Sequence, residues 1–331
     1  MQDDLQRSWR RLAVVIAVSG ACLAPVPPQS QGPRPAPPAA KPEPVRRAGA
    51  IVTPEWLDQH PGATVFHVSW GGGFAYRWAH IPGAIHFDTN RIERAPLWKL
   101  IPDAELEKAL LDLGVTKTSR VVLYGTPTMA ATRAGLALLY AGVEDVRILD
   151  GGLAAWRAAG RPTESGRNRP VPAAAFGAPF PGRPDLIVGS GEVRALLGRD
   201  DALVVSVRSR PEQEGETSGY RDLDARGRIA GDVWVGGGSD AHHMEEYENP
   251  DGTLLSPESV ARRWAGSGIV PDKRVVFYCG TGWRASLAFW DAWALGWSRI
   301  GVYDPGWYEW SRDPANPVTT GPLAGRGRGG S

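Results

Sequence analysis

An internal repeat spans most of the sequence. Val121 and Val275 open similar apolar segments 154 residues apart, and Asp150 and Asp304 are separated by the same number of residues. Four blocks of the first half recur in the same order in the second half: TVFHVS (64–69) as LVVSVR (203–208), HIPGAIHFD (80–88) as RIAGDVWVG (228–236), VVLYG (121–125) as VVFYC (275–279), and ILDGGLAAW (148–156) as VYDPGWYEW (302–310). Such a repeat indicates two copies of one domain in tandem.

The repeat also suggests where the domains begin and end. We predict a first domain at residues 49–165 and a second at residues 186–318, joined by a linker at residues 166–185 that is rich in proline and alanine. Residues 319–331 are expected to form a flexible tail. Two domains agree with a length of 331 residues, because one domain commonly holds about 100–200 residues.

Within each copy, short apolar runs alternate with helical patterns. Residues 204–207 and 275–278 are rich in valine and are typical of buried strands. Ser256, followed by Pro257 and Glu258, is a typical helix start. The alternation predicts an α/β fold of two tandem domains, each a parallel sheet flanked by helices.

The first 48 residues are expected to lie outside these domains. Three arginines precede an apolar stretch at residues 12–24, which is shorter than the ~20 residues that a membrane-spanning helix needs. The pattern is typical of a secretory signal peptide at residues 1–21, with cleavage after Ala21. We therefore expect an exported protein of the periplasm or cell envelope.

Cys22 would then be the first residue of the mature chain. The segment SGAC (19–22) resembles a bacterial lipoprotein signal, so one expectation is a lipid on Cys22 that anchors the protein to the membrane. Ordinary secretion without a lipid is the alternative. Residues 22–48 are rich in proline, which favours an extended linker between the signal and the first domain.

Charge and cysteine content exclude several classes of function. Lys and Arg total 37 against 36 Asp and Glu, for a net charge of +1, so nucleic-acid binding through bulk positive charge is not expected. The chain has two cysteines, which excludes a disulfide scaffold and a cysteine-rich zinc site.

The other cysteine, Cys279, stands between the predicted strand at residues 275–278 and a helix that the apolar pattern predicts over residues 285–295. It opens the segment CGTGWR, in which Gly280 and Gly282 permit a tight turn. Backbone N–H groups at such a turn, together with the helix dipole, stabilise an anion and thus favour the thiolate of a cysteine. Arg284 adds a fixed positive charge. The segment predicts that Cys279 is a nucleophile.

These motifs resemble those of the rhodanese, or sulfurtransferase, family. The resemblance rests on HIPGAI (80–85), LDGGLAAW (149–156) and CGTGWR (279–284), and it covers residues 49–318. Together with the segment at 237–253, CGTGWR is most similar to exported, multi-domain thiosulfate sulfurtransferases. The resemblance implies two rhodanese-like domains, of which the second is catalytic.

The resemblance also implies the reaction. Cys279 attacks the outer sulfur of thiosulfate, sulfite leaves, and the sulfur stays on Cys279 as a persulfide. An acceptor, which is cyanide in assays or a thiol or dithiol, then removes that sulfur. No nucleotide-binding loop, metal motif or basic stripe is apparent elsewhere, so we expect no cofactor, no metal and no nucleic-acid partner.

Other functions compete with this interpretation. Related phosphatases have five residues between cysteine and arginine, whereas four separate Cys279 from Arg284, so the loop length argues against phosphate transfer. A 3-mercaptopyruvate sulfurtransferase is the first alternative, because CGTG also occurs in that branch of the family. A non-catalytic module that carries a persulfide between partners is the second alternative.

The first copy lacks the nucleophile. Gly125 stands where the second copy has Cys279, and the surrounding segment YGTPT (124–128) has no thiol. We therefore expect the first domain to be catalytically silent and to contribute packing. A further expected role is to form one wall of a cleft between the two domains.

The resemblance implies substrate contacts as well. They are expected from the loop residues Gly280, Thr281, Gly282, Trp283 and Arg284, from Arg208, and more weakly from Arg221. Structural roles are the alternatives: Thr281 as a brace of the loop, Trp283 as a core residue and Arg208 in a surface ion pair. Ser206 stands where many rhodaneses carry an aspartate, two residues before the arginine that Arg208 matches, and this departure puts in doubt the contact that the aspartate normally makes.

Two adjacent histidines, His242 and His243, lie in an acidic segment with Asp240, Glu245 and Glu246. Adjacent side chains on a loop usually point apart and no partner motif follows, so we do not expect a metal site here. We expect this segment to border the active cleft.

Overall fold

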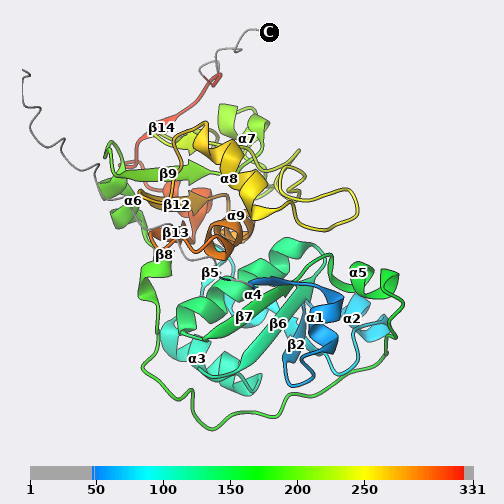
Figure 1. Cartoon of the computed structure of the whole chain (residues 1–331). Coiled ribbons are helices and arrows are strands. Elements are labelled where there is room, and N and C mark those ends of the chain that lie inside the picture. The colour runs from blue at the N-terminus through cyan, green and yellow to red at the C-terminus, as the bar shows by residue number, and fades with distance from the viewer. Residues whose placement is uncertain (1–46, 48, 324–331) are drawn as a thin grey trace, which may run out of the picture. The chain divides into compact units, whose positions relative to one another are not determined.

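The computed structural model describes Arg47 and residues 49–323 (Figure 1). The predicted signal peptide, Cys22 and nearly all of the proline-rich linker lie outside these residues. No helix within the described ranges is long and apolar enough to cross a membrane.

Five parallel strands form the sheet of the first domain, in the order β1–β7–β6–β2–β3. They are β1 (Ile51–Val52), β2 (Thr64–Ser69), β3 (Ile85–Asp88), β6 (Arg120–Gly125) and β7 (Asp145–Leu149). The helices of this domain are α1 (Pro54–Asp58), α2 (Phe74–Trp78), α3 (Asp103–Asp112), α4 (Thr128–Ala141) and α5 (Gly152–Ala158). The valines and leucine of β6 are buried, as expected for a central strand of a parallel sheet with both faces covered.

The second domain repeats this topology. Its parallel sheet has the order β8–β13–β12–β9–β11. The strands are β8 (Ile187–Val188), β9 (Ala202–Ser206), β11 (Val233–Trp234), β12 (Arg274–Tyr278) and β13 (Ile300–Tyr303). The helices are α6 (Ser190–Leu196), α7 (Arg210–Glu214), α8 (Pro257–Ala265), α9 (Trp283–Ala294) and α10 (Gly306–Trp310). The matching strand orders confirm the duplicated α/β fold.

Two short antiparallel strand pairs accompany the sheets, of which the first is a hairpin. Strand β4 (Glu93–Arg94) pairs with β5 (Lys99–Leu100), and β10 (Arg228–Ile229) pairs with β14 (Val318–Thr319). Single-turn 3-10 helices occur at Thr89–Arg91 and Pro184–Leu186. Helix α8 begins as predicted, because the Ser256 side chain accepts a hydrogen bond from the N–H of Ser259 and Pro257 is the first helical residue.

The two domains share one hydrophobic core. Helices α4 and α9, which occupy equivalent places in the two repeats, pack against each other (Figure 1). Gly135 of α4 faces the indole ring of Trp290 of α9, and a methyl group at Gly135 would lie 2.8 Å from that ring. The ring of Trp290 therefore leaves no room for a side chain at Gly135. One cluster of buried side chains therefore extends through both domains.

The predicted linker and tail are more tightly packed than their composition suggests. In the linker, Ala173 donates a backbone hydrogen bond to Leu111 at 2.9 Å, and Phe176 is buried in the shared core. Thr319 of β14 pairs with Arg228 of β10, and the N–H of Gly321 donates to the carbonyl of Glu214 at 2.9 Å. The packed chain thus continues past residue 318, and residues 324–331 lie outside the described part.

Candidate active site

Cys279 lies directly after β12, at the carboxyl end of the central strand of the second sheet. Its side chain is a free thiol that is only 1% exposed, and Cys279 is one of the residues that line a cavity of about 660 Å³. Helix α10 supports the loop from behind: the N–H of Trp307 donates to the Cys279 carbonyl at 2.8 Å, and the N–H of Tyr308 donates to the Gly280 carbonyl at 3.1 Å. The cysteine is therefore held at an inner surface that a ligand can reach.

Both glycines of the loop are required by its geometry. A methyl group at Gly280 would lie 2.0 Å from the hydroxyl oxygen of Tyr220, so the ring of Tyr220 leaves no room for a side chain there. Gly282 has a φ of 86° and is the residue that precedes α9. This left-handed conformation lets the chain turn from the strand into the helix. Helix α9 begins at Trp283, two residues earlier than the helical pattern in the sequence.

The backbone of the loop offers free hydrogen-bond donors. None of the N–H groups from Gly280 to Ala285 donates a hydrogen bond to another described residue. Those from Trp283 onward form the first turn of α9, where helices leave N–H groups unsatisfied. Donors in this position favour an anion. That these donors face the sulfur of Cys279 stays a prediction from the sequence.

Arg284 closes the loop through an ion pair with Glu212 of α7. Its Nη1 and Nη2 lie 2.8 Å from Oε2 and Oε1 of Glu212, and both side chains are buried. Burial alone would raise the pKa of Glu212, but Arg284 and Arg208 beside it lower that pKa to about 2. Arg284 is one of the residues that line the cavity of Cys279. Its buried Nε has no hydrogen-bond partner among the described residues. Arg284 can therefore donate one more hydrogen bond toward a ligand.

Arg208, the other arginine expected to bind substrate, does not line this cavity. Its guanidinium is fully buried: Nη1 donates to the carbonyl of Gly227 at 2.6 Å, Nε and Nη2 lie 3.3 Å from Glu212 and the Ser218 carbonyl, and the group packs over Trp307. The surface ion pair considered as the alternative is wrong, because this ion pair is buried. The geometry gives Arg208 a role in holding Glu212, and its contact with substrate remains an unsupported prediction.

Arg221 and the histidine segment differ in their relation to the cavity of Cys279. Arg221 is exposed and lines a neighbouring hollow of about 470 Å³. His242 and His243 border the cavity of Cys279 itself, as the sequence predicts, and Nδ1 of His243 lies 2.7 Å from Oδ1 of Asp240. Among the described residues, no group of three metal-ligating side chains is placed to hold a metal ion.

Trp283 and Thr281 line the cavity as well. Trp283 is only half-buried, so it is a wall of the cavity more than a core residue. Trp307 and Trp310, by contrast, are fully buried core residues.

The first domain, which has Gly125 where the second has Cys279, supplies part of the cavity. The lining residues that it contributes are Trp70, Glu93, Trp98, Thr126, Pro127 and Met129. The β4–β5 hairpin reaches the second domain, where Leu97 and Trp98 pack on a cluster of buried side chains. This arrangement places one wall of the cavity on the domain that has no nucleophile.

A buried charge network joins this wall to the cysteine loop. Arg133 of α4 donates from Nε to Oε2 of Glu93 at 2.9 Å and also forms an ion pair with Asp304, which follows β13. The indole Nε1 of Trp283 donates to Oε1 of Glu93 at 2.8 Å. Glu93 thus links the first domain to a residue of the segment CGTGWR.

Several lining residues escaped prediction from the sequence. Glu93 and Trp98 lie in a hairpin with strands of two residues, too short for a periodic pattern. Tyr308 lies in α10 between the core residues Trp307 and Trp310, and nothing in its sequence neighbourhood indicates that it lines a cavity. Tyr220 directly precedes Arg221, a weak candidate, but its position across Gly280 depends on the fold.

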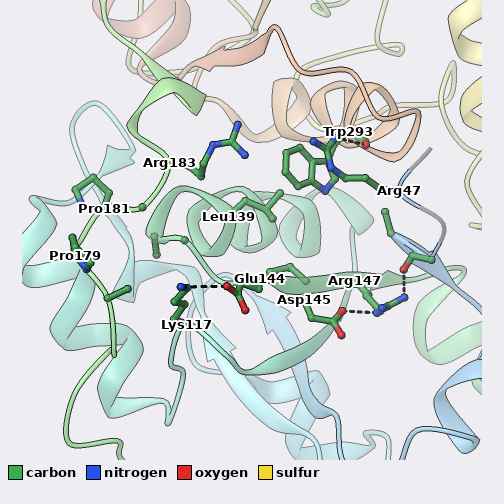
Figure 2. Close-up of a pocket in the computed structure, with 17 residues that line it drawn as sticks. Arg47, Lys117, Leu139, Glu144, Asp145, Arg147, Pro179, Pro181, Arg183 and Trp293 are labelled. Carbon is green, nitrogen blue, oxygen red and sulfur yellow. Dashed lines mark hydrogen bonds and ion pairs between the residues drawn. The ribbon is translucent and has the colours of Figure 1, made fainter. Parts of the chain in front are cut away.

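A second cavity, of about 720 Å³, lies away from the cysteine (Figure 2). Figure 2 shows Lys117 directed at Glu144 and Arg147 directed at Asp145; these pairs lie 3.3 Å and 2.6 Å apart. The guanidinium of Arg47 packs over the ring of Trp293 and donates to the carbonyl of Trp293 at 3.0 Å. Because its charged groups already have partners, we do not assign this cavity a reaction.

Comparison with known proteins agrees with this geometry. The model of the rhodanese-like domain family matches residues 68–159 and 190–313. Thiosulfate sulfurtransferase YnjE of Escherichia coli is 45% identical over 283 residues, which cover 82% of this chain and 65% of YnjE. This chain therefore spans slightly less than two thirds of the length of that relative. A probable 3-mercaptopyruvate sulfurtransferase of Pseudomonas aeruginosa is 33% identical, over 76% of this chain and 87% of its own length.

Solved structures extend the comparison. The crystal structure of YnjE has a TM-score of 0.81 and 43% identity, and covers 83% of this chain and 69% of that chain. A complex of EanB with hercynine has the same TM-score and 39% identity, and covers 83% of this chain and 70% of that chain. Another EanB structure is described as a cysteine persulfide with ergothioneine. This chain belongs to the rhodanese superfamily of sulfurtransferases.

Proposed function

We propose that the protein transfers sulfur from thiosulfate to an acceptor through a persulfide on Cys279. The observation that supports this most strongly is the loop at the end of β12. It presents a free thiol at a cavity, and the N–H groups of the residues that follow the cysteine have no partner among the described residues. The name of the relative YnjE, a thiosulfate sulfurtransferase, supports the choice of donor.

The first half of the reaction forms the persulfide. The thiolate of Cys279 attacks the outer sulfur of thiosulfate, the sulfur–sulfur bond of thiosulfate breaks, and sulfite leaves with the electron pair. We propose that the N–H groups of Gly280, Thr281 and Gly282, together with Nε of Arg284, stabilise the negative charge on the bound sulfur; the support is that none of these donors has a partner among the described residues.

The second half returns the cysteine to its thiolate. An acceptor attacks the outer sulfur of the persulfide, and the bond between that sulfur and Sγ of Cys279 breaks. Trp283 and Thr281 line the space that the acceptor must enter, so we propose both as acceptor contacts. The two displacements need the cysteine, a donor and an acceptor, and no cofactor takes part.

Replacement of the nucleophile tests this proposal. We expect Cys279→Ser to abolish sulfur transfer from thiosulfate to cyanide, while circular dichroism and the unfolding midpoint stay close to those of the wild type. Activity that persists in a folded Cys279→Ser protein would rule the proposal out. Rates with thiosulfate and with 3-mercaptopyruvate, measured on the same wild-type protein, decide between the two donors.

A specific observation favours a second kind of acceptor, an organic cation. The cavity is lined by the aromatic rings of Trp70, Trp98 and Trp283, and by the carboxylates of Glu93 and Asp222. Aromatic faces and carboxylates together attract a cation such as a trimethylammonium group. Because structures of EanB hold hercynine or ergothioneine, we propose hercynine as a candidate acceptor.

Mass spectrometry of the small molecules tests this acceptor. The protein, charged with thiosulfate, is incubated with hercynine in the absence of thiols. We expect a product heavier than hercynine by one sulfur atom. If the persulfide persists and hercynine is unchanged, hercynine is not an acceptor.

We further propose that the protein is exported to the periplasm or cell envelope, with a lipid on Cys22 as its membrane anchor. The support is the pattern of residues 1–24, which the structure does not describe. The mass of the mature N-terminus tests it: a chain that begins at a lipid-modified Cys22 is expected, whereas an intact Met1 would rule out cleavage.

A further inference from the structure

Glu93 brings a carboxyl group of the silent first domain to the cavity that holds Cys279. It begins the β4–β5 hairpin and lines the same cavity as the thiol. The side chain of Glu93 is fully shielded from solvent, and Cys279 is almost as well shielded. Burial of an ionised carboxylate is unfavourable unless nearby charges compensate for it, so this placement needs a physical reason.

Two donors from different domains fix the position of the carboxyl group. Arg133 of the first domain donates to Oε2, and the indole of Trp283, in the second domain, donates to Oε1. Because Trp283 belongs to the cysteine loop, Glu93 is held in a defined position relative to the nucleophile. Each carboxylate oxygen has a further lone pair, so these bonds leave Glu93 able to accept a proton.

The buried charges around Glu93 do not balance. One guanidinium, that of Arg133, faces the two carboxylates of Glu93 and Asp304. Asp304 also accepts the N–H of Leu100 at 2.7 Å. Burial is the main cause that raises the pKa of Glu93. Arg133 opposes this rise and Asp304 adds to it, and the resulting pKa is about 7. Glu93 can thus exchange a proton near neutral pH.

Other titratable groups that line the cavity are less suited to take a proton from a ligand bound next to Cys279. Asp222 is exposed at the rim and accepts a hydrogen bond from a tyrosine hydroxyl. Tyr220 keeps its proton, because burial raises its pKa to about 12. His242 and His243 are also exposed at the rim, and His243 is bound to Asp240.

We propose that Glu93 is the general base for acceptors that must lose a proton, such as thiols. The inference rests on the proposed function, because it requires a persulfide on Cys279. The carboxylate of Glu93 takes the proton of the acceptor thiol, and the thiolate attacks the outer sulfur of the persulfide. A new sulfur–sulfur bond forms while the bond to Sγ of Cys279 breaks, and the electron pair returns to Cys279 as its thiolate. The acceptor leaves as a persulfide, and Glu93 releases its proton to solvent.

Two acceptors of different chemistry test this role. Full-length protein is charged with thiosulfate, desalted, and mixed rapidly at pH 8 with either 2-mercaptoethanol or sulfite. At this pH the thiol still has to lose a proton, whereas most sulfite does not. We expect Glu93→Gln to lower the ratio of the thiol rate to the sulfite rate by at least about tenfold, the lower part of the range for general base catalysis.

A matched control shows whether any loss of charge has this effect. Glu144 is an exposed residue of the first domain, paired with Lys117 at 3.3 Å, and lies outside the cavity of Cys279. We expect Glu144→Gln to keep the ratio of the wild type. If Glu93→Gln slows both acceptors equally, Glu93 only holds Trp283 in place and the inference is wrong.

A measurement on the wild type covers the case in which Glu93→Gln does not fold. Proton transfer in the rate-limiting step makes the thiol reaction slower in D₂O, so we expect a solvent isotope effect that is larger for the thiol than for sulfite. Equal isotope effects would overturn the inference. If thiosulfate leaves Cys279 uncharged, the proposed function itself fails, whereas a charged Cys279 with an unchanged thiol-to-sulfite ratio contradicts this inference alone.

Discussion

Arg284 and Glu212 form a two-point ion pair in which Nη1 and Nη2 each lie 2.8 Å from a carboxylate oxygen. Glu212 also lies 3.3 Å from Nε of Arg208 and accepts the hydroxyl and the N–H of Ser209. One carboxylate therefore fixes both buried arginines of this site, and with them the edge of the cysteine loop.

Loss of this carboxylate is expected to destabilise the protein and to reduce its activity. Glu212→Gln removes the negative charge and leaves Arg284 and Arg208 buried without full compensation, at a cost of about 3–5 kcal/mol in the free energy of unfolding. Urea unfolding measures this change, and the rate of thiosulfate consumption measures the activity. Glu192→Gln is the control, because Glu192 is 47% exposed and its pair with Arg274 should contribute less than about 1 kcal/mol. Equal stability losses in both variants would contradict the assignment.

The contact between Tyr220 and Gly280 predicts a second effect. Gly280→Ala forces a methyl group against the ring of Tyr220, so we expect a loss of about 1–3 kcal/mol in stability and a marked fall in activity. Tyr220→Ala in the same chain should restore much of the lost stability, because it removes the clash. A double-mutant cycle measures the coupling. Additive losses would show that the two residues do not interact as the structure describes.

Restoring a cysteine to the first domain should not restore catalysis there. A side chain at Gly125 would place its Cβ 2.6 Å from the carbonyl oxygen of Val68, and Pro127 two residues later has no N–H group to donate. We expect a protein with Gly125→Cys and Cys279→Ser to remain inactive with thiosulfate. Detectable turnover by that double variant would mean that the silent loop can still form an anion-binding turn.

The sequence is informative about the active site where the pattern is local. Strand, loop and helix are consecutive around Cys279, and each carries its own signal: buried valines, two glycines and a helical apolar face. The repeat made the duplicated sheets predictable too, because both copies keep the same blocks. The helix start was misplaced by two residues because Gly282, not a polar side chain, precedes α9.

The parts that could not be predicted depend on contacts between distant segments. Glu93 and Trp98 reach the cavity only because the β4–β5 hairpin packs on the second domain. Arg208 follows a buried strand, as expected of a substrate ligand, but Glu212 on α7 lies beside it and binds its guanidinium. No spacing in the sequence indicates which partner a buried arginine will find.

A buried histidine predicts how stability depends on pH. His67 is 5% exposed, and burial, followed by the nearby His86 and His80, lowers its pKa from 6.5 to about 4. The unfolded chain therefore binds a proton that the folded chain does not, and stability rises with pH across this interval. The contribution of His67, roughly 2–3 kcal/mol, is fully present above pH 6.5 and is lost as the pH falls toward 4.

Unfolding experiments at several pH values measure this dependence. The slope of the free energy of unfolding between pH 4 and 6.5 should be smaller in His67→Phe than in the wild type. His242→Gln, which changes an exposed histidine, is the control and should keep the slope of the wild type. An unchanged slope in His67→Phe would show that this histidine does not carry the effect.

The mass of the peptide that contains Cys279, measured after the protein is incubated with thiosulfate and desalted, reports directly on the sulfur that this residue is proposed to carry. We expect an increase of about 32 Da, one sulfur atom, on Cys279 and its loss after addition of cyanide. The same treatment of Cys279→Ser should give no such increase. A wild-type peptide of unchanged mass while thiosulfate is being consumed would contradict a persulfide on Cys279.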